Sequence, residues 1–339
     1  MQDNIPNYGS TLHHGNTPGG PGYSFKPAKK RAIGPWLYII MFIATCITTT
    51  MGGVYWLGKD PYDVSNFHLG ITYAALVILF LSFHEFGHYF AAKYHKIDTT
   101  LPFYIPMPDM LNPFGTMGAV IRIRDPIKTK KALFDIGIAG PIAGFVVAVA
   151  SIIYGLLTLP SIDYLYAIHP EYVSGGLPPV TGLTFSNTLI YSLLKFVLPL
   201  PQNAFIPPMN EIYHYPFLCA GWFGLFVTSL NLMPIGQLDG GHITYALLGN
   251  KHKIVTRIFF GVLVLMSVIG ILNYAEIINY PDLGSPMWVI WVVLLFFVIK
   301  IDHPPIYDQG ELGLGRKLLG VFAFIMFISS FTPAPIKDF

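Results

Sequence analysis

The residues best suited to chemistry are His84, Glu85 and His88, which form the pattern His-Glu-x-x-His within the apolar run LFLSFHEFGHYFAAKYHK. On a helix, this spacing puts the two imidazoles one turn apart on the same face, where both can bind one zinc ion. Glu85 is rotated from His84 by about 100 degrees, so its carboxylate points beside the metal and can serve as a general base. The pattern predicts a metal-dependent hydrolytic site.

The apolar setting strengthens this prediction. In a soluble helix the five-residue pattern is a weak signal, because it arises by chance. If Lys93 marks the membrane interface, Glu85 lies about 8 residues deeper, or roughly 12 Å. An ionisable side chain in hydrocarbon costs at least about 2.5 to 3.5 kcal/mol, which favours a functional role. The alternative is a polar cluster that joins helices.

A catalytic zinc site needs a third protein ligand and one open position. The segment NLMPIGQLDGGH at 231–242 supplies a candidate in Asp239. Pro234 and the glycines around Asp239 interrupt helix, so we expect Asp239 on an irregular segment turned into the helix bundle. Taken alone, Asp239 would also fit an interfacial carboxylate beside a basic loop. His242 is the competing ligand, ranked second because it lies nearer the predicted inside surface.

Composition indicates a membrane protein. Of the 339 residues, 53% are hydrophobic and 11% are charged, whereas soluble domains have about a quarter charged residues. The cysteines, Cys46 and Cys219, lie in apolar runs, which excludes a secreted disulfide scaffold. The net charge of +2, without a basic stripe interleaved with aromatic residues, argues against nucleic-acid binding.

Apolar segments predict an all-α polytopic membrane protein with six to seven transmembrane helices. The candidate spans are about 34–57, 69–92, 133–159, 212–233, 256–272, 287–301 and 314–331. The last two are short or interrupted by glycine, which leaves the count open. We expect residues 1–33 to form a disordered cytoplasmic tail, residues 34–66 the first transmembrane helix and an outside loop, and residues 251–339 the C-terminal transmembrane helices.

The basic residues predict orientation. If the tail is cytoplasmic and seven spans alternate, all of the 20 Lys and Arg residues except Lys59, Lys195 and Lys337 lie on the inside. We therefore expect a multi-pass protein of a bacterial inner (cell) membrane, with the N-terminus and the active site toward the cytoplasm.

Two segments do not fit plain spans. Residues 98–124 are rich in proline and contain a strand-like run from Met117 to Ile123. We expect a small membrane-associated β-hairpin there, covered by the bundle, with a cytoplasmic hairpin as the alternative. Within the predicted outside loop 160–211, residues 184–200 are expected to form a helix in the membrane interface.

The segments HEFGH at 84–88 and NLMPIGQLDGG at 231–241 together resemble the site-2 protease family of intramembrane zinc metalloproteases. The similarity covers about residues 69–250, including FGTMGAVIRIRDP at 114–126 and DIGIAGPIAGF at 135–145. It implies that residues 67–250 form an intramembrane metalloprotease core. The implied roles are zinc ligand for His84, His88 and Asp239, general base for Glu85, and a position close to the metal, holding substrate or its oxyanion, for Asn231.

The resemblance is closest to the branch of the family that lacks a PDZ domain, and it implies one Zn²⁺ per chain. The implied activity is regulated intramembrane proteolysis: hydrolysis of peptide bonds in or next to transmembrane helices of membrane proteins, such as membrane-anchored regulators or leftover signal peptides. A metal-binding transporter or a catalytically silent scaffold on the same fold is the alternative. Transport would need further ionisable residues along a path, and the spans offer only Asp135 and Glu276, both near their ends. Gly140 and Gly144 are interpreted as helix-packing residues only.

Overall fold

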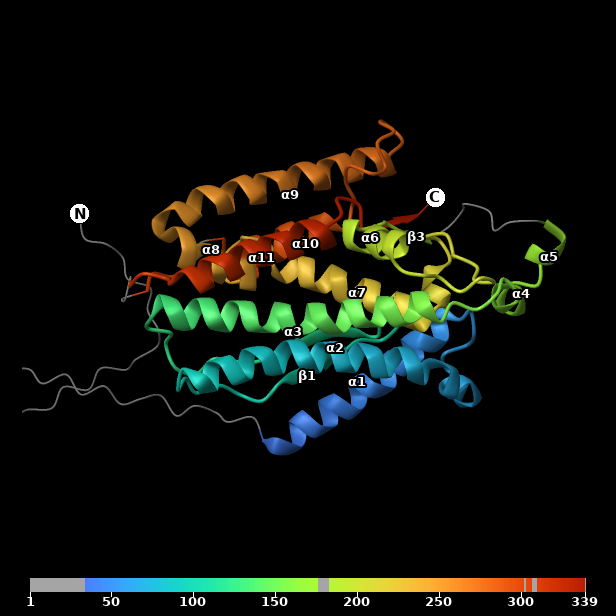
Figure 1. Ribbon diagram of the computed structural model, residues 1–339, viewed down its shortest axis with the longest axis horizontal. Helices are drawn as coiled ribbons and strands as arrows, with labels where there is room; N and C mark the ends of the chain where they lie inside the picture. Colours follow the sequence, from blue (N-terminus) through green and yellow to red (C-terminus); the bar gives the residue numbers. More distant parts are fainter. Residues whose placement is uncertain (1–33, 176–182, 302, 307–309, 339) are drawn as a thin grey trace, which may run out of the picture.

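The computed structural model describes residues 34–175, 183–301, 303–306 and 310–338. The predicted tail at 1–33 lies outside the described residues. The first part of the bundle contains four apolar helices: α1 (Pro35–Trp56), α2 (Phe67–Tyr94), α3 (Lys130–Leu157) and α7 (Pro216–Asn231). The helix α2 packs on both α1 and α3, and α3 packs on α7. Figure 1 shows α1 at one edge of the bundle, with α2, α3 and α7 stacked inward from it.

The helices α2 and α7 run in the same direction. A Cβ at Gly224 would lie 3.0 Å from Phe80, and His84 meets Asn231 one turn further along α2 and about two turns further along α7. The helix α3 runs in the opposite direction, because its earlier residue Gly140 faces His88 and its later residue Gly144 faces His84. The second half of α2 is therefore enclosed by two helices, which removes the His84-Glu85-x-x-His88 segment from the surface.

The C-terminal part of the chain adds α8 (Asp239–Leu248), α9 (His252–Tyr274), α10 (Trp288–Leu294) and α11 (Leu314–Ser330). A 3₁₀ turn, η3 (Gly249–Lys251), joins α8 to α9, and the π-helical segment η4 (Leu295–Ile299) follows α10. In Figure 1, α9 lies at the edge opposite α1. Its outer face is apolar and exposed, with Ile258, Leu265 and Ile271 among the accessible side chains. Such a surface suits contact with lipid.

Four helical segments of the described chain are long and apolar enough to cross a membrane: Pro35–Trp56, Val64–Tyr94, Lys130–Leu157 and Asp239–Tyr274. Pro216–Asn231 and Trp288–Ile299 are apolar but shorter. The prediction of a mostly helical protein with membrane-spanning helices is confirmed, whereas the count of six to seven spans is not. The helix α7 has 16 residues and is buried along most of its length.

The proline-rich segment contains the predicted hairpin. Strand β1 (Phe103–Pro106) pairs antiparallel with β2 (Thr116–Val120), with Phe103 opposite Val120. The expected strand of residues 117–123 is thus displaced: β2 begins one residue earlier and ends at Val120, and only an isolated bridge between Thr99 and Ile123 continues the pairing.

A second pair of strands was not predicted. Strand β3 (Leu183–Phe185) pairs antiparallel with β4 (Ile336–Asp338), near the end of the chain. The predicted interface helix at 184–200 is correspondingly wrong in extent, since the helix α6 covers only Leu189–Val197. Thr188 begins that helix by accepting a hydrogen bond from the backbone N–H of Tyr191, a typical N-cap. The same region contains the short helices η1 (Val64–Asn66), α4 (Asp163–Ile168), α5 (Tyr172–Gly175) and η2 (Ile212–His214).

Candidate active site

The structure brings His84, His88 and Asp239 together. The Nε2 atoms of the two histidines are 3.1 Å apart, and Oδ2 of Asp239 lies 3.4 Å from Nε2 of His84 and 3.2 Å from Nε2 of His88. A tetrahedral zinc ion with bonds of 2.0 to 2.1 Å needs ligand atoms about 3.3 Å apart. The three atoms therefore have the spacing of three corners of a zinc tetrahedron.

An outer hydrogen bond orients the ring of His88 for metal binding. Nδ1 of His88 lies 2.7 Å from the backbone carbonyl of Ile136. A carbonyl only accepts, so Nδ1 carries the proton and the lone pair of Nε2 points to the centre of the site. Both histidines are buried. The amide Nδ2 of Asn231 lies 3.2 Å from Nε2 of His84, at the end of α7. Two imidazoles and one carboxylate, with this arrangement of lone pairs, fit Zn²⁺.

The turn between α7 and α8 positions Asp239. The helix α7 ends at Asn231, the chain turns through Pro234 and Gly236, which has φ +56°, and α8 begins at Asp239 itself. The expectation of an irregular segment at Asp239 is thus wrong by one position, because the irregular chain ends just before it. The reason is a close approach: a Cβ at Gly240 would lie 2.0 Å from the carbonyl of Leu232, so only glycine lets α8 begin here.

Glu85 lies beside the three ligand atoms and not among them. Its side chain is 7% exposed, and its carboxylate is close enough to His84, His88 and Asp239 to interact with their charges. The backbone N–H of Ile121, directly after β2, is near enough to interact with this carboxylate. The hairpin therefore lies against the part of α2 that carries Glu85. The sequence could not predict this contact, because the group that interacts with Glu85 is a backbone N–H and not a side chain.

Gly140 and Gly144 let α3 pack closely against the two histidines of α2. A Cβ at Gly140 would lie 2.1 Å from Nε2 of His88, and a Cβ at Gly144 would lie 3.1 Å from Nδ1 of His84. The interpretation of these glycines as helix-packing residues is confirmed, and their contacts on α2 are the two imidazoles, which occupy space that a side chain on α3 would fill. The spacing Gly-x-x-x-Gly was visible in the sequence, but its partner helix was not.

His242, the alternative ligand, lies outside the three-residue group. Its Nδ1 is 2.7 Å from Nε2 of His303, and the ring of His303 stacks on Tyr245 with centroids 4.5 Å apart. Sequence analysis missed His303 because it lies 61 residues from its partner and belongs to no motif.

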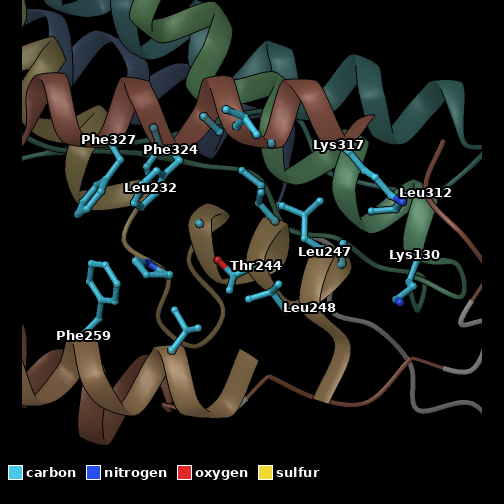
Figure 2. A pocket seen from close by; sticks show the side chains of 18 of the residues that line it. Lys130, Leu232, Thr244, Leu247, Leu248, Phe259, Leu312, Lys317, Phe324 and Phe327 are labelled. Atoms are coloured by element: carbon cyan, nitrogen blue, oxygen red, sulfur yellow. The ribbon is translucent and has the colours of Figure 1, made fainter. Parts of the chain in front are cut away.

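A separate cavity of about 770 Å³ lies between α8, α9 and α11. Figure 2 shows Thr244, Leu247, Leu248, Phe259 and Phe327 around it. Its lining is mainly apolar, and among the described residues it includes Gly240 but none of the candidate ligands. The cavity is therefore a feature of the C-terminal helices and not the candidate active site.

Comparison with known proteins assigns the chain to a class. Residues 72–272 match the model of peptidase family M50. The chain belongs to this family of peptidases, which confirms the resemblance to the site-2 proteases. The matched residues include the candidate ligands, most of α2 and all of α8.

Two curated proteins that are similar to this chain are named as probable zinc metalloproteases. The chain is 27% identical over 273 residues to "Probable zinc metalloprotease EGY1, chloroplastic" of Arabidopsis thaliana, which covers 80% of this chain and 44% of that protein. It is 25% identical over 283 residues to "Probable zinc metalloprotease EGY2, chloroplastic" of Oryza sativa subsp. indica, covering 80% of this chain and 45% of that protein. The chain thus spans less than half the length of these relatives.

Proposed function

We propose that the protein is an intramembrane zinc metalloprotease that hydrolyses peptide bonds in or next to transmembrane helices of membrane-protein substrates. The observation that carries the proposal is the convergence of His84, His88 and Asp239, with Glu85 beside them, within apolar helices. In the proposed assignment, the first three residues hold one zinc ion and Glu85 is the general base.

The chemistry follows from the position of each group. When bound, zinc polarises the scissile carbonyl and brings the pKa of a water molecule toward about 7. Glu85 accepts the proton of the attacking water and delivers it to the leaving amine. The Ile121 N–H, which lies near the Glu85 carboxylate, is proposed to keep it oriented between the two transfers. The Asn231 amide, next to His84, holds the substrate or donates to the oxyanion of the tetrahedral intermediate.

The substrate can be identified as a membrane protein that accumulates uncut when the protease is inactive. Quantitative membrane proteomics of cells carrying the wild type or Glu85→Gln is expected to reveal at least one membrane protein that is full-length only in the variant. Membrane-anchored regulators and leftover signal peptides are the proposed classes. Identical membrane proteomes would contradict a proteolytic role in those cells.

The hairpin is proposed to hold the substrate in an extended form. A helical peptide bond is shielded by its own hydrogen bonds, and an unpaired amide in hydrocarbon costs several kcal/mol. Among the described residues, β2 pairs only with β1, and it leads directly to the residue that contacts Glu85. An extended substrate added to the edge of β2 would lie close to the general base.

Val120→Pro tests this pairing. Proline removes a backbone donor and bends the strand, so cleavage is expected to fall at least about 10-fold while zinc content stays nearly unchanged. Val120→Ala keeps the N–H and is expected to cleave at close to the normal rate. The rates are measured on a purified transmembrane substrate. Normal cleavage by Val120→Pro would exclude strand addition.

We propose that the N-terminus and the active site face the cytoplasm, as in a bacterial inner membrane. This orientation is supported by the basic residues, several of which gather at the end of the bundle where α2 ends and α3 and α11 begin. In the same region, Arg316 forms an ion pair of 2.7 Å with Asp135, which His95 also contacts. Asp135 therefore has partners that tie α3 to α11, which argues against its use in a transport path.

Cysteine labelling tests the orientation. In a background with Cys46→Ala and Cys219→Ala, an impermeant thiol reagent is expected to label Ser65→Cys on intact cells. Asn250→Cys, at the opposite end of the bundle, should be labelled only after permeabilisation. Both replaced side chains are exposed, so failure to label reflects the side of the membrane. The reverse pattern would overturn the proposed topology.

A further inference from the structure

A second convergence of ligand atoms lies at the other end of the bundle from the candidate active site. His169 lies between α4 and α5, and Glu211 and His214 lie at η2, just before α7. Their ligand atoms lie within 4.8 Å of one another. The Nε2 atoms of the two histidines are 2.9 Å apart, and Oε2 of Glu211 is 3.3 Å from Nε2 of His214 and 4.0 Å from Nε2 of His169.

The outer hydrogen bonds of both histidines leave their Nε2 lone pairs facing inward. Nδ1 of His214 lies 2.5 Å from the backbone carbonyl of Trp56. Nδ1 of His169 lies 2.8 Å from Oε1 of Glu171. Carbonyl and carboxylate oxygens only accept, so each Nδ1 carries the proton. Two acceptor nitrogens then face each other at hydrogen-bonding distance, an arrangement that needs a cation or a proton between them.

Glu211 adds a third acceptor. Its side chain is 2% exposed. Oε1 accepts hydrogen bonds from Tyr172 at 3.0 Å and from Asn210 at 3.3 Å, and burial together with this carboxylate raises the pKa of Tyr172 to about 12, so its hydroxyl remains a donor. Within the described part of the chain, Oε2 is buried and has no hydrogen-bond partner. A buried carboxylate oxygen without a partner is costly.

We propose that His169, Glu211 and His214 bind a second divalent metal ion, with Zn²⁺ as the best match. Two imidazole nitrogens and one carboxylate oxygen are ligands that zinc prefers, and a fourth position remains for water. The bonds from His169 to Glu171 and from His214 to the Trp56 carbonyl are the outer contacts that orient metal-binding histidines. The inference is independent of the proposed proteolysis, because none of these residues belongs to the active site.

The position of this site indicates a structural role. A metal here would join three distant parts of the chain: the end of α1 through Trp56, the segment after α4, and the start of α7. The 16 residues of α7 separate His214 from Asn231 by about 24 Å, whereas two metals that act on one bond lie about 3.5 to 4 Å apart. The second metal would therefore fix the start of the helix that carries Asn231 and would not take part in the chemistry.

Metal content of the purified full-length protein tests the proposal. After loading with Zn²⁺ and removal of excess, the wild type is expected to hold about two zinc ions per chain and His214→Ala or Glu211→Gln about one. His88→Ala should also hold about one, and His88→Ala with His214→Ala close to none. His68→Ala is the matched control, since His68 is an exposed histidine at the start of α2 and its loss should leave two. Zinc is measured by mass spectrometry against protein concentration.

A spectroscopic variant covers the case in which the alanine proteins fail to fold. His169→Cys offers a thiolate, which also binds zinc and cobalt. With Co²⁺, this variant is expected to gain a thiolate-to-cobalt charge-transfer band that the wild type lacks. No such band, or a wild type with one zinc that disappears with His88→Ala alone, would overturn the second site and leave a shared proton between the histidines. A zinc content that responds to His214→Ala but not to His88→Ala would instead contradict the proposed active site.

Discussion

Replacing Glu85 by glutamine is expected to abolish cleavage while the protein keeps the zinc at His84, His88 and Asp239. The amide has nearly the same size and shape as the carboxylate and its oxygen can still face the Ile121 N–H, but it cannot take a proton from water. General acid–base catalysis contributes about 10²- to 10⁴-fold, so the rate should fall at least about 100-fold. Cleavage of a purified transmembrane substrate and zinc content are measured on the same preparation.

Variants of the three proposed zinc ligands should differ from Glu85→Gln in their zinc content. His84→Ala, His88→Ala and Asp239→Ala are each expected to lose the zinc of this site together with activity, because two remaining ligands hold zinc weakly. Glu85→Gln distinguishes the role of general base from that of zinc ligand only if its zinc content equals that of the wild type. Full proteolytic activity in Glu85→Gln would refute the role of Glu85.

Gly140→Ala is expected to damage the proposed zinc site from a neighbouring helix. The added Cβ would lie 2.1 Å from Nε2 of His88, so the imidazole must rotate away from the position at which it meets His84 and Asp239. Loss of an orienting contact around a metal typically costs 10- to 100-fold in affinity, and displacement of a ligand should cost at least about as much. Competition with a calibrated zinc chelator measures the affinity, and cleavage should fall in parallel.

Gly261→Ala is the matched control for this experiment. Gly261 also lies within an apolar helix, α9, but a Cβ there meets nothing within 4 Å. Alanine is favoured over glycine in a helix interior by about 1 kcal/mol, so zinc affinity and activity should be unchanged. Equal zinc affinity in Gly140→Ala and Gly261→Ala would show that the His88 ring does not need the space above Gly140.

Much of the fold was predictable because apolar length and local motifs specify it. The expected segments 34–57, 69–92 and 133–159 correspond to α1, α2 and α3 within about three residues at each end. The candidate ligands could also be predicted from the sequence, because His84 and His88 are one helical turn apart and Asp239 follows a break in an apolar segment. Their convergence required only that α2 and α7 run in the same direction, which the alternation of spans predicts.

The features that sequence analysis missed depend on distant partners. Strands β3 and β4 are three residues each and pair across about half of the chain, and such short runs contain no periodicity of their own. The start of α8 depends on the fit of Gly240 against the Leu232 carbonyl. The cluster of His169, Glu211 and His214 combines residues some 40 positions apart, so no local sequence motif could predict it.

The shortness of α7 has a consequence for the supply of water. At about 24 Å, this helix of 16 residues falls short of the roughly 30 Å of hydrocarbon in a bilayer. It is surrounded by protein over most of its length, and the non-helical chain that follows carries backbone groups that hydrocarbon cannot satisfy. The residues directly after it, 232–236, are buried, so the end of α7 places non-helical polar backbone inside the bundle, beside the point at which His84 meets Asn231. Hydrolysis consumes a water molecule at each turnover, and we expect water to reach the site along this polar backbone rather than across hydrocarbon.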